Sequence, residues 1–204
     1  MKDLILLLAD KNAQFALKGA LERPKAIGIR KIEFDFRVHA GRDGGVRKSG
    51  PETLALLRRQ FNHALLVLDY EGSGAGAQSA LELEAELDER LKTVWQDAAK
   101  AIVIEPELDI WIWGSDNAIK QVIKWPIGGT IRNWIKGKGF NVSENSKPDR
   151  PKEALEAVLR ELDIPRSSSL YHEITSRISL ARCKDMAFQR MRQKLASWFP
   201  PPVV

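Results

Sequence analysis

A short apolar run that leads directly into two acids and a glycine-rich turn is the feature that most constrains this chain. The run is Ala64–Leu68, and Asp69, Glu71 and the turn Gly72–Gly76 follow it. A run of this length and composition is typical of a central parallel strand that is covered on both faces. Ligands in open α/β sheets bind in the crevice beyond the carboxyl ends of such strands. The two acids therefore stand where a ligand site is expected.

Asp69 and Glu71 lie two residues apart, so continued extended geometry turns both carboxylates to the same face of the sheet. Two carboxylates at a strand end can supply the protein ligands of Mg²⁺, which often takes only one or two. The alternative, which has equal weight on this stretch alone, is an acidic loop in solvent. The glycines also fit a dinucleotide-binding turn, but the acids would repel the pyrophosphate of such a ligand.

Three more segments have the character of strands. Leu4–Ala9 is apolar and leads to Asp10, Lys100–Glu105 is apolar and ends on an acid, and Ile32–Val38 alternates between apolar and polar residues. Helical segments separate the strands at Ala13–Glu22, Glu52–Phe61 and Ala77–Trp95. Strands that alternate with helices predict an α/β fold with a mostly parallel sheet of about four strands, flanked by helices.

The segment His39–Gly50 is rich in glycine and basic residues, which predicts a mobile loop or, alternatively, a loop that contacts phosphate. Pro51 then suits the first position of the helix that follows. Pro106–Trp113 fits a helix that begins at its proline, while the alternation of its aliphatic residues fits a continued strand. The pattern leaves both interpretations of that segment open.

The distribution of charge divides the chain near Trp113. Residues 1–113 carry 16 Lys and Arg against 18 Asp and Glu, whereas residues 114–204 carry 16 against 9. Helical spacing recurs in the second part. We therefore expect an α/β core over residues 1–113 and a helical, basic region over residues 114–204, packed on the core or appended to it. An acidic site beside a basic region suits a polyanion such as nucleic acid.

Five basic residues of the second part are candidates for a nucleic-acid-binding face, because Phe188 and Trp198 are interleaved with them. They are Arg182, Lys184, Arg190, Arg192 and Lys194. The alternative, which the pattern favours, is a solvated helix surface with the aromatic rings turned to the core.

Other classes of site have little support. Cys183 is the single cysteine, which excludes an internal disulfide and is compatible with a reducing cytoplasm. The three histidines are scattered without zinc-ligand spacing, and no serine-nucleophile motif occurs. No apolar run approaches the roughly 20 residues of a membrane span, and the first run lacks the flanks of a signal peptide. We therefore expect a cytoplasmic protein with no membrane contact.

Acids follow three of the predicted strands. In a parallel sheet these strand ends meet at one edge, so acids that are distant in sequence can gather there. Gathered carboxylates repel and raise one another's pKa unless a cation lies between them. The pattern favours a metal site, with candidate ligands Asp10, Asp69, Glu71, Glu105 and Asp109.

The segments Leu4–Asp10, Leu66–Gly72 and Ile104–Trp111 together resemble the Toprim-like fold, in particular the small Toprim-like proteins of bacterial anti-phage defence islands. These proteins include RloB-like and related uncharacterised families, and the chain is also similar to the Toprim-like component of methylation-associated defence systems. Toprim domains have an acid after the first strand and an Asp-x-Asp-type pair after a later one. Their usual residues are glutamate at the position of Asp10 and aspartate at that of Glu71, so this chain keeps each carboxylate and changes its reach by one methylene.

The resemblance implies a phosphodiesterase or nuclease of a defence system that depends on Mg²⁺ or Mn²⁺. It implies that Asp10, Asp69 and Glu71 bind the metal and serve catalysis, with Glu105 and Asp109 as further ligands or supporting acids. The alternative is a non-catalytic defence subunit that uses the same fold to bind nucleic acid or a partner protein of the defence system.

Overall fold

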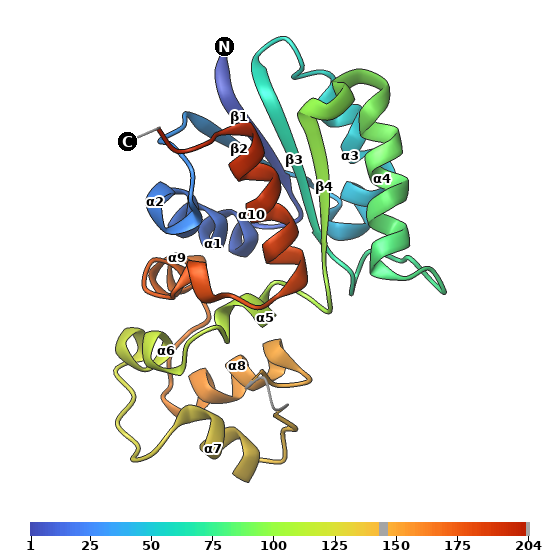
Figure 1. The fold of residues 1–204 in the computed structure, drawn as a ribbon. Helices are drawn as coiled ribbons and strands as arrows, with labels where there is room; N and C mark the ends of the chain where they lie inside the picture. The colour runs from blue at the N-terminus through green and yellow to red at the C-terminus, as the bar shows by residue number, and fades with distance from the viewer. Residues whose placement is uncertain (143–146, 203–204) are drawn as a thin grey trace.

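The computed structural model describes residues 1–142 and 147–202 of the 204-residue chain. Its centre is a sheet of four strands in the order β2-β1-β3-β4 (Figure 1). The strands are β1 (Lys2–Leu8), β2 (Phe34–Val38), β3 (Phe61–Asp69) and β4 (Ala99–Ile104). Each neighbouring pair is parallel. The predicted α/β fold with a sheet of about four strands is confirmed.

Helices connect the strands and make up most of the C-terminal region. The helices of the first part are α1 (Lys11–Leu21), α2 (Pro24–Ile27), α3 (Arg42–Ala55) and α4 (Ala80–Trp95), with the 3-10 turn η1 (Gln96–Ala98) before β4. The later helices are α5 (Asp109–Ile112), α6 (Asp116–Ile123), α7 (Ile131–Gly137), α8 (Pro151–Glu161), α9 (Ser168–Thr175) and α10 (Met186–Trp198), with the 3-10 turn η2 (Leu180–Arg182) before α10. The segment left open between helix and strand thus contains the short helix α5. No helix in the described residues is long and apolar enough to cross a bilayer.

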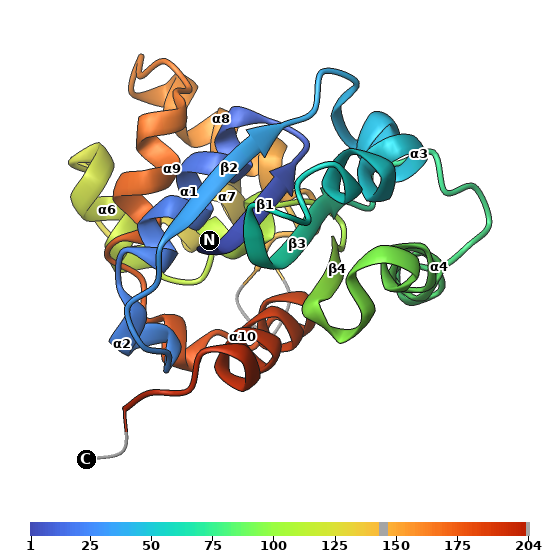
Figure 2. The ribbon, with the colours of Figure 1, turned by 90° about the horizontal axis from the view of Figure 1, so that it is seen from above.

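Both faces of the sheet are covered by helices (Figure 2). Neighbouring residues of a strand point to opposite faces. In β1, Leu4 and Leu6 therefore pack in one core with α1, α9 and α10, whereas Ile5 and Leu7 pack in a second core with α3 and α4. Because neither face meets water, β1 and β3 are apolar at nearly every position rather than at every second one.

The predicted loop at His39–Gly50 is wrong, because α3 begins at Arg42 and continues to Ala55. Its glycines allow the helix to approach the sheet closely. A Cβ atom at Gly50 would lie 2.6 Å from Cδ1 of Leu66 on β3, a distance at which the two would clash. Close packing against the sheet therefore outweighs the poor helix propensity of glycine in this segment.

Pro51 lies inside α3 and not at its first position. A proline cannot donate a helical hydrogen bond, so the carbonyl of Arg47, four residues earlier, lacks its usual partner. The guanidinium of Arg90 on α4 supplies the missing donor, since its Nη1 atom lies 2.7 Å from the Arg47 oxygen. Arg90 also pairs with Glu52. This side chain from a neighbouring helix compensates for the proline.

Acidic side chains cap the outer edge of β4, which has no neighbouring strand on that side. Carboxylate oxygens of Asp88 and Glu84 accept the backbone N–H groups of Ala101 and Val103 over 2.7 and 3.0 Å. Glu84 is buried and also accepts two hydrogen bonds of 2.8 Å from Arg190 on α10. Burial alone would raise the pKa of Glu84, but the Arg190 and Val103 hydrogen bonds outweigh it and lower the pKa. The edge is thereby closed to strand pairing.

Removal of the Glu84 carboxylate should destabilise the fold strongly. We expect Glu84→Ala to lower the free energy of unfolding by about 3 kcal/mol, since it removes the carboxylate that pairs with the Arg190 guanidinium and leaves the Val103 N–H group without its acceptor. Urea denaturation measures this change. Glu89→Ala is the matched control on the same helix, because Glu89 is exposed and its one ion pair within residues 1–142 and 147–202 is with Lys92 over 3.9 Å. It should change the stability by less than about 0.5 kcal/mol, and equal effects of the two substitutions would contradict the assigned role.

Candidate acidic site at the carboxyl edge of the sheet

A cavity of about 640 Å³ lies beyond the carboxyl ends of β1 and β3. Six carboxyl groups and three cationic side chains line it, together with polar and glycine residues. The lining residues are Asp10, Asn12, Gly41, Arg42, Asp43, Gly44, Asp69, Glu71, Gly72, Glu107, Leu108, Asp109, Lys152 and Arg166. We call this space the acidic cavity. Its position is the one expected for a ligand site in a parallel α/β sheet.

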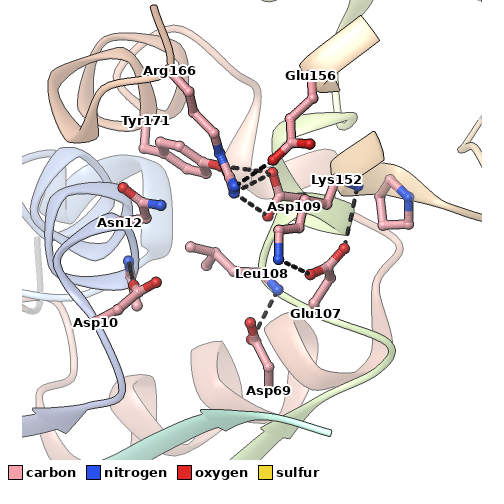
Figure 3. Close-up of polar contacts among 12 residues, drawn as sticks. Asp10, Asn12, Asp69, Glu107, Leu108, Asp109, Lys152, Glu156, Arg166 and Tyr171 are labelled. Carbon is pink, nitrogen blue, oxygen red and sulfur yellow. Dashed lines mark hydrogen bonds and ion pairs between the residues drawn. The ribbon is translucent and has the colours of Figure 1, made fainter. Parts of the chain in front are cut away.

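Asp10 and Asp69 are held at this edge by backbone hydrogen bonds. Asp10 caps α1, and its Oδ1 atom accepts the Ala13 N–H group over 2.8 Å. Oδ1 of Asp69 accepts the Leu108 N–H group over 2.9 Å (Figure 3). Each of the two carboxylates therefore has one oxygen fixed by the fold, and both side chains line the same cavity.

Asp43, in the first turn of α3, is a cavity residue that the sequence did not identify. Its Oδ1 atom accepts the backbone N–H group of Asp69 over 2.8 Å, which connects α3 to the end of β3. Burial raises the pKa of Asp43, and the negative charge of Asp10 adds to the increase. The sequence did not identify Asp43 as a site residue because its segment has the composition of a loop. Packing on the sheet makes the segment a helix.

Burial also raises the pKa of Asp69 well above its usual value, and the charges of Asp43 and Asp109 add to this effect. The hydrogen bond from Leu108 opposes the increase. Carboxylates in this arrangement repel one another, so protons or a cation must offset their charge. This electrostatic strain is the main chemical property of the cavity.

Glu107 is 7% exposed and faces the acidic cavity from the turn after β4. Its carboxylate accepts a hydrogen bond of 3.3 Å from the backbone N–H group of Lys152 and lies 3.8 Å from the side-chain Nζ atom of the same lysine (Figure 3). Burial raises the pKa of Glu107 to about 7, with a further contribution from Asp109, while Lys152 opposes the increase. Glu107 thus changes charge near neutral pH.

Asp109 is enclosed by two donors from the C-terminal helical region. Its carboxylate lies 3.1 Å from Nη2 of Arg166 and accepts the hydroxyl of Tyr171 over 2.7 Å (Figure 3). Arg166 also pairs with Glu156 over 2.9 Å. Burial raises the pKa of Asp109, although Arg166 and Tyr171 oppose the increase, and burial and the Asp109 charge raise the pKa of Tyr171. This network anchors α8 and α9 to the edge of the sheet.

The structure brings together four of the five predicted metal ligands. Asp10, Asp69, Glu71 and Asp109 line the acidic cavity, where Glu71 is exposed and the other three are at least partly buried. Glu105 is exposed and does not line the cavity. Glu107, two residues further on, faces the cavity in its place.

A cage of protein ligands for a metal is not present in the described residues, since no three Asp, Glu, His or Cys side chains there form a group that could hold an ion. The cavity does fit Mg²⁺ in another way. Mg²⁺ often takes one or two carboxylates and completes its octahedron with water and substrate phosphate. A divalent cation beside Asp69 and Asp43 would also relieve the repulsion that raises their pKa values.

The five basic residues predicted to bind nucleic acid have different surroundings. Arg190 pairs with Glu84, and Arg192 donates to the carbonyls of Ile27 and Ala181, so both guanidinium groups serve the fold. Lys194 lies over the ring of Trp198, and Arg182 donates to Ser179. Lys184 is exposed and lines a separate groove. None of the five lines the acidic cavity.

No protein-family model, curated protein or solved structure matches this chain. Fold and site define a parallel α/β protein whose sheet carries an acidic cavity at its carboxyl edge. The C-terminal helices supply Lys152 and the segment between them supplies Arg166, which are two of the three cations in that cavity.

The raised pKa of Glu107 predicts a pH-dependent loss of stability. Between its ordinary value of 4.5 and about 7, the folded protein binds more protons than the unfolded chain, so stability falls as the pH rises through this window. Glu107→Gln removes the charge that destabilises the folded protein at pH 8, so it should be more stable than the wild type there. We expect a difference of about 1–2 kcal/mol, since water that reaches the cavity screens part of the charge and reduces the effect. At pH 4.5 the two proteins should be equally stable.

Urea denaturation in EDTA across this pH range measures the difference. Glu105→Gln is the matched control, since it changes an exposed carboxyl outside the cavity. Its stability profile should follow that of the wild type. A constant difference between Glu107→Gln and the wild type at every pH would contradict the assignment.

Proposed function

We propose that this protein is a Mg²⁺-dependent, Toprim-like phosphodiesterase or nuclease that serves bacterial anti-phage defence. The observation that supports the proposal is the gathering of Asp10, Asp43 and Asp69 in one cavity at the carboxyl edge of a parallel sheet. The resemblance to Toprim domains assigns metal binding and catalysis to Asp10, Asp69 and Glu71. Mn²⁺ is the expected substitute, because it also prefers oxygen ligands.

Asp10 and Asp69 would hold the metal, with Glu71 at the exposed side of the cavity. The bound ion would polarise a phosphate oxygen and lower the pKa of an attacking water. Asp43 positions Asp69, because it holds the backbone N–H group of that residue over 2.8 Å. Arg42 and Lys152, which also line the cavity, would bind the phosphate through their positive charges. Glu107, with a pKa of about 7, is placed to exchange a proton at neutral pH.

The proposal predicts cleavage of nucleic acid in Mg²⁺ or Mn²⁺ and its loss when Asp69 is neutralised. Asp69→Asn keeps an oxygen that can accept the Leu108 N–H group, and Asp69→Ala removes it, so the pair separates catalysis from folding. Either substitution should lower the rate at least about 100-fold, since metal-assisted stabilisation is worth several kcal/mol. Asp97→Asn, at an exposed position outside the cavity, should leave the rate unchanged. Activity that survives in both Asp69 variants would refute the assignment.

Metal binding can be measured without any substrate. With a dissociation constant of about 1 mM, about 10 mM MgCl₂ should raise the melting temperature by about 3–6 °C at pH 8. The increase should be smaller at pH 5.5, because protons compete with the metal for the Asp69 carboxyl, whose pKa is raised. Asp69→Asn should remove the increase at both pH values. Calorimetric titration with MgCl₂ provides the independent check.

The second candidate is a non-catalytic defence subunit that binds nucleic acid or a partner protein with the same fold. Among the described residues no three carboxylates, histidines or cysteines are arranged to hold a metal. This observation favours a binding subunit over an enzyme with a preformed metal centre. Absence of Mg²⁺ and Mn²⁺ binding at millimolar concentrations would select the subunit over the enzyme.

A further inference from the structure

A second hollow lies on the other side of the turn that walls the acidic cavity. It has a volume of about 810 Å³ and is lined by residues of the ranges 136–142 and 147–149 and by residues 184–186, which lead into α10. We call it the basic groove. Three lysines line it, and they are Lys136, Lys147 and Lys184.

The chain segment 106–110 lines both hollows. Pro106 and Ile110 line the basic groove, while the three residues between them line the acidic cavity. In Figure 1 this segment follows the end of β4, above the helices α7 and α8. A ligand in the groove therefore lies within one short turn of the gathered carboxylates.

The charges of the groove suit a polyanion. Lys136 and Lys184 are exposed, and neither has an ion pair within residues 1–142 and 147–202. Of the two acids in the lining, Asp185 is already engaged, because it caps α10 at Phe188, accepts Nε1 of Trp111 and pairs with Lys147 over 3.5 Å. Asp149 accepts the side-chain amide of Asn141 over 3.3 Å.

Half of the lining is apolar, and part of it is open to solvent. Met186 is 66% exposed, and the ring of Phe140 carries the guanidinium of Arg150 at 4.9 Å from its centre. Lysines beside apolar and aromatic surface are the combination that binds single-stranded nucleic acid, since the cations contact phosphates and the apolar groups contact bases. A duplex presents its bases less readily to such a groove.

We infer that the basic groove binds a single strand of nucleic acid and leads its backbone to the acidic cavity. This inference rests on the proposed phosphodiesterase function, and it assigns the substrate class of that site. It also moves the predicted nucleic-acid contact from the five basic residues between Arg182 and Lys194 to the groove, where Lys184 is the residue that the two assignments share.

Binding is measured separately from cleavage, by fluorescence anisotropy of labelled 12-nucleotide single-stranded DNA and RNA in EDTA. Lys136→Ala combined with Lys184→Ala should weaken binding at least about tenfold at low salt. The slope of log affinity against log salt should fall by about 1.4 for the loss of two phosphate contacts. The matched control is Lys25→Ala combined with Lys48→Ala, which removes the same charge from exposed positions outside the groove. It should change the affinity less than about twofold.

If the two double variants weaken oligonucleotide binding equally, or if the wild type does not bind, the assignment of strand binding to the basic groove is wrong. Stronger binding of an acidic peptide than of the oligonucleotides would also overturn it, in favour of a protein ligand. The proposed enzyme is tested by a different result: if the groove variant loses binding while the wild type cleaves nothing in Mg²⁺, the groove stands and the phosphodiesterase does not. If cleavage is lost in Asp69→Asn but binding is unchanged in the groove variant, the enzyme stands and the groove does not.

Discussion

The arrangement of the site depends on the end of β3, where Asp69 connects three parts of the chain. Its N–H group donates to Asp43 at the start of α3, and its carboxylate accepts from Leu108 just before α5. Enclosed backbone groups need partners, and carboxylates are the stronger acceptors for them. The hydrogen bonds that fix both segments against the sheet therefore also bring acids together. The same hydrogen bonds therefore serve both the fold and the acidic cavity.

The gathered acids need positive charge, and most of it comes from the C-terminal region. Arg166 holds Asp109, and Lys152 holds Glu107, from positions more than 40 residues later in the chain. The helical region thus completes the cavity by supplying two of its three cations. Within the described residues Asp69 and Asp43 have no comparable ion pair, since backbone N–H groups are their hydrogen-bond partners, although the charge of Arg42 acts to lower the pKa of Asp43. A metal ion or a proton has its greatest effect at these two carboxyls.

The sequence predicted the parts of the structure that local patterns encode. Apolar runs identified β1, β3 and β4, and acids at strand ends identified Asp10 and Asp69 as residues of one edge. Asp43 was missed because the helical state of its segment comes from glycine packing on the sheet, which local composition does not encode. Glu105 was selected over Glu107 because the direction of the turn after β4 cannot be read from residue types.

Long-range pairing explains the remaining differences. Arg190 has the sequence pattern of a nucleic-acid contact, but in the structure it pairs with Glu84, which lies 106 positions away. The folded chain brings the two residues together. A basic residue in a helical pattern can neutralise a buried acid or face solvent, and its immediate neighbours are the same in both cases. The sequence therefore supported a basic surface in the second part of the chain without separating structural cations from exposed ones. Lys184 is exposed in the structure, and Arg190 is not.

The separation of charge between the two hollows has a physical consequence for any phosphodiester that enters the site. The six carboxyl groups of the acidic cavity outnumber its three cationic side chains, so a phosphate is repelled there on balance as long as the carboxyls are ionised and no cation is bound. Contacts made by the rest of a long polyanion in the basic groove can offset that repulsion, since free energy gained at remote contacts is available at the reacting group. A single nucleotide lacks these contacts. Under the proposed function, the site would therefore favour a long strand over a single nucleotide, and the segment 106–110, which lines both hollows, is where the two contributions would meet.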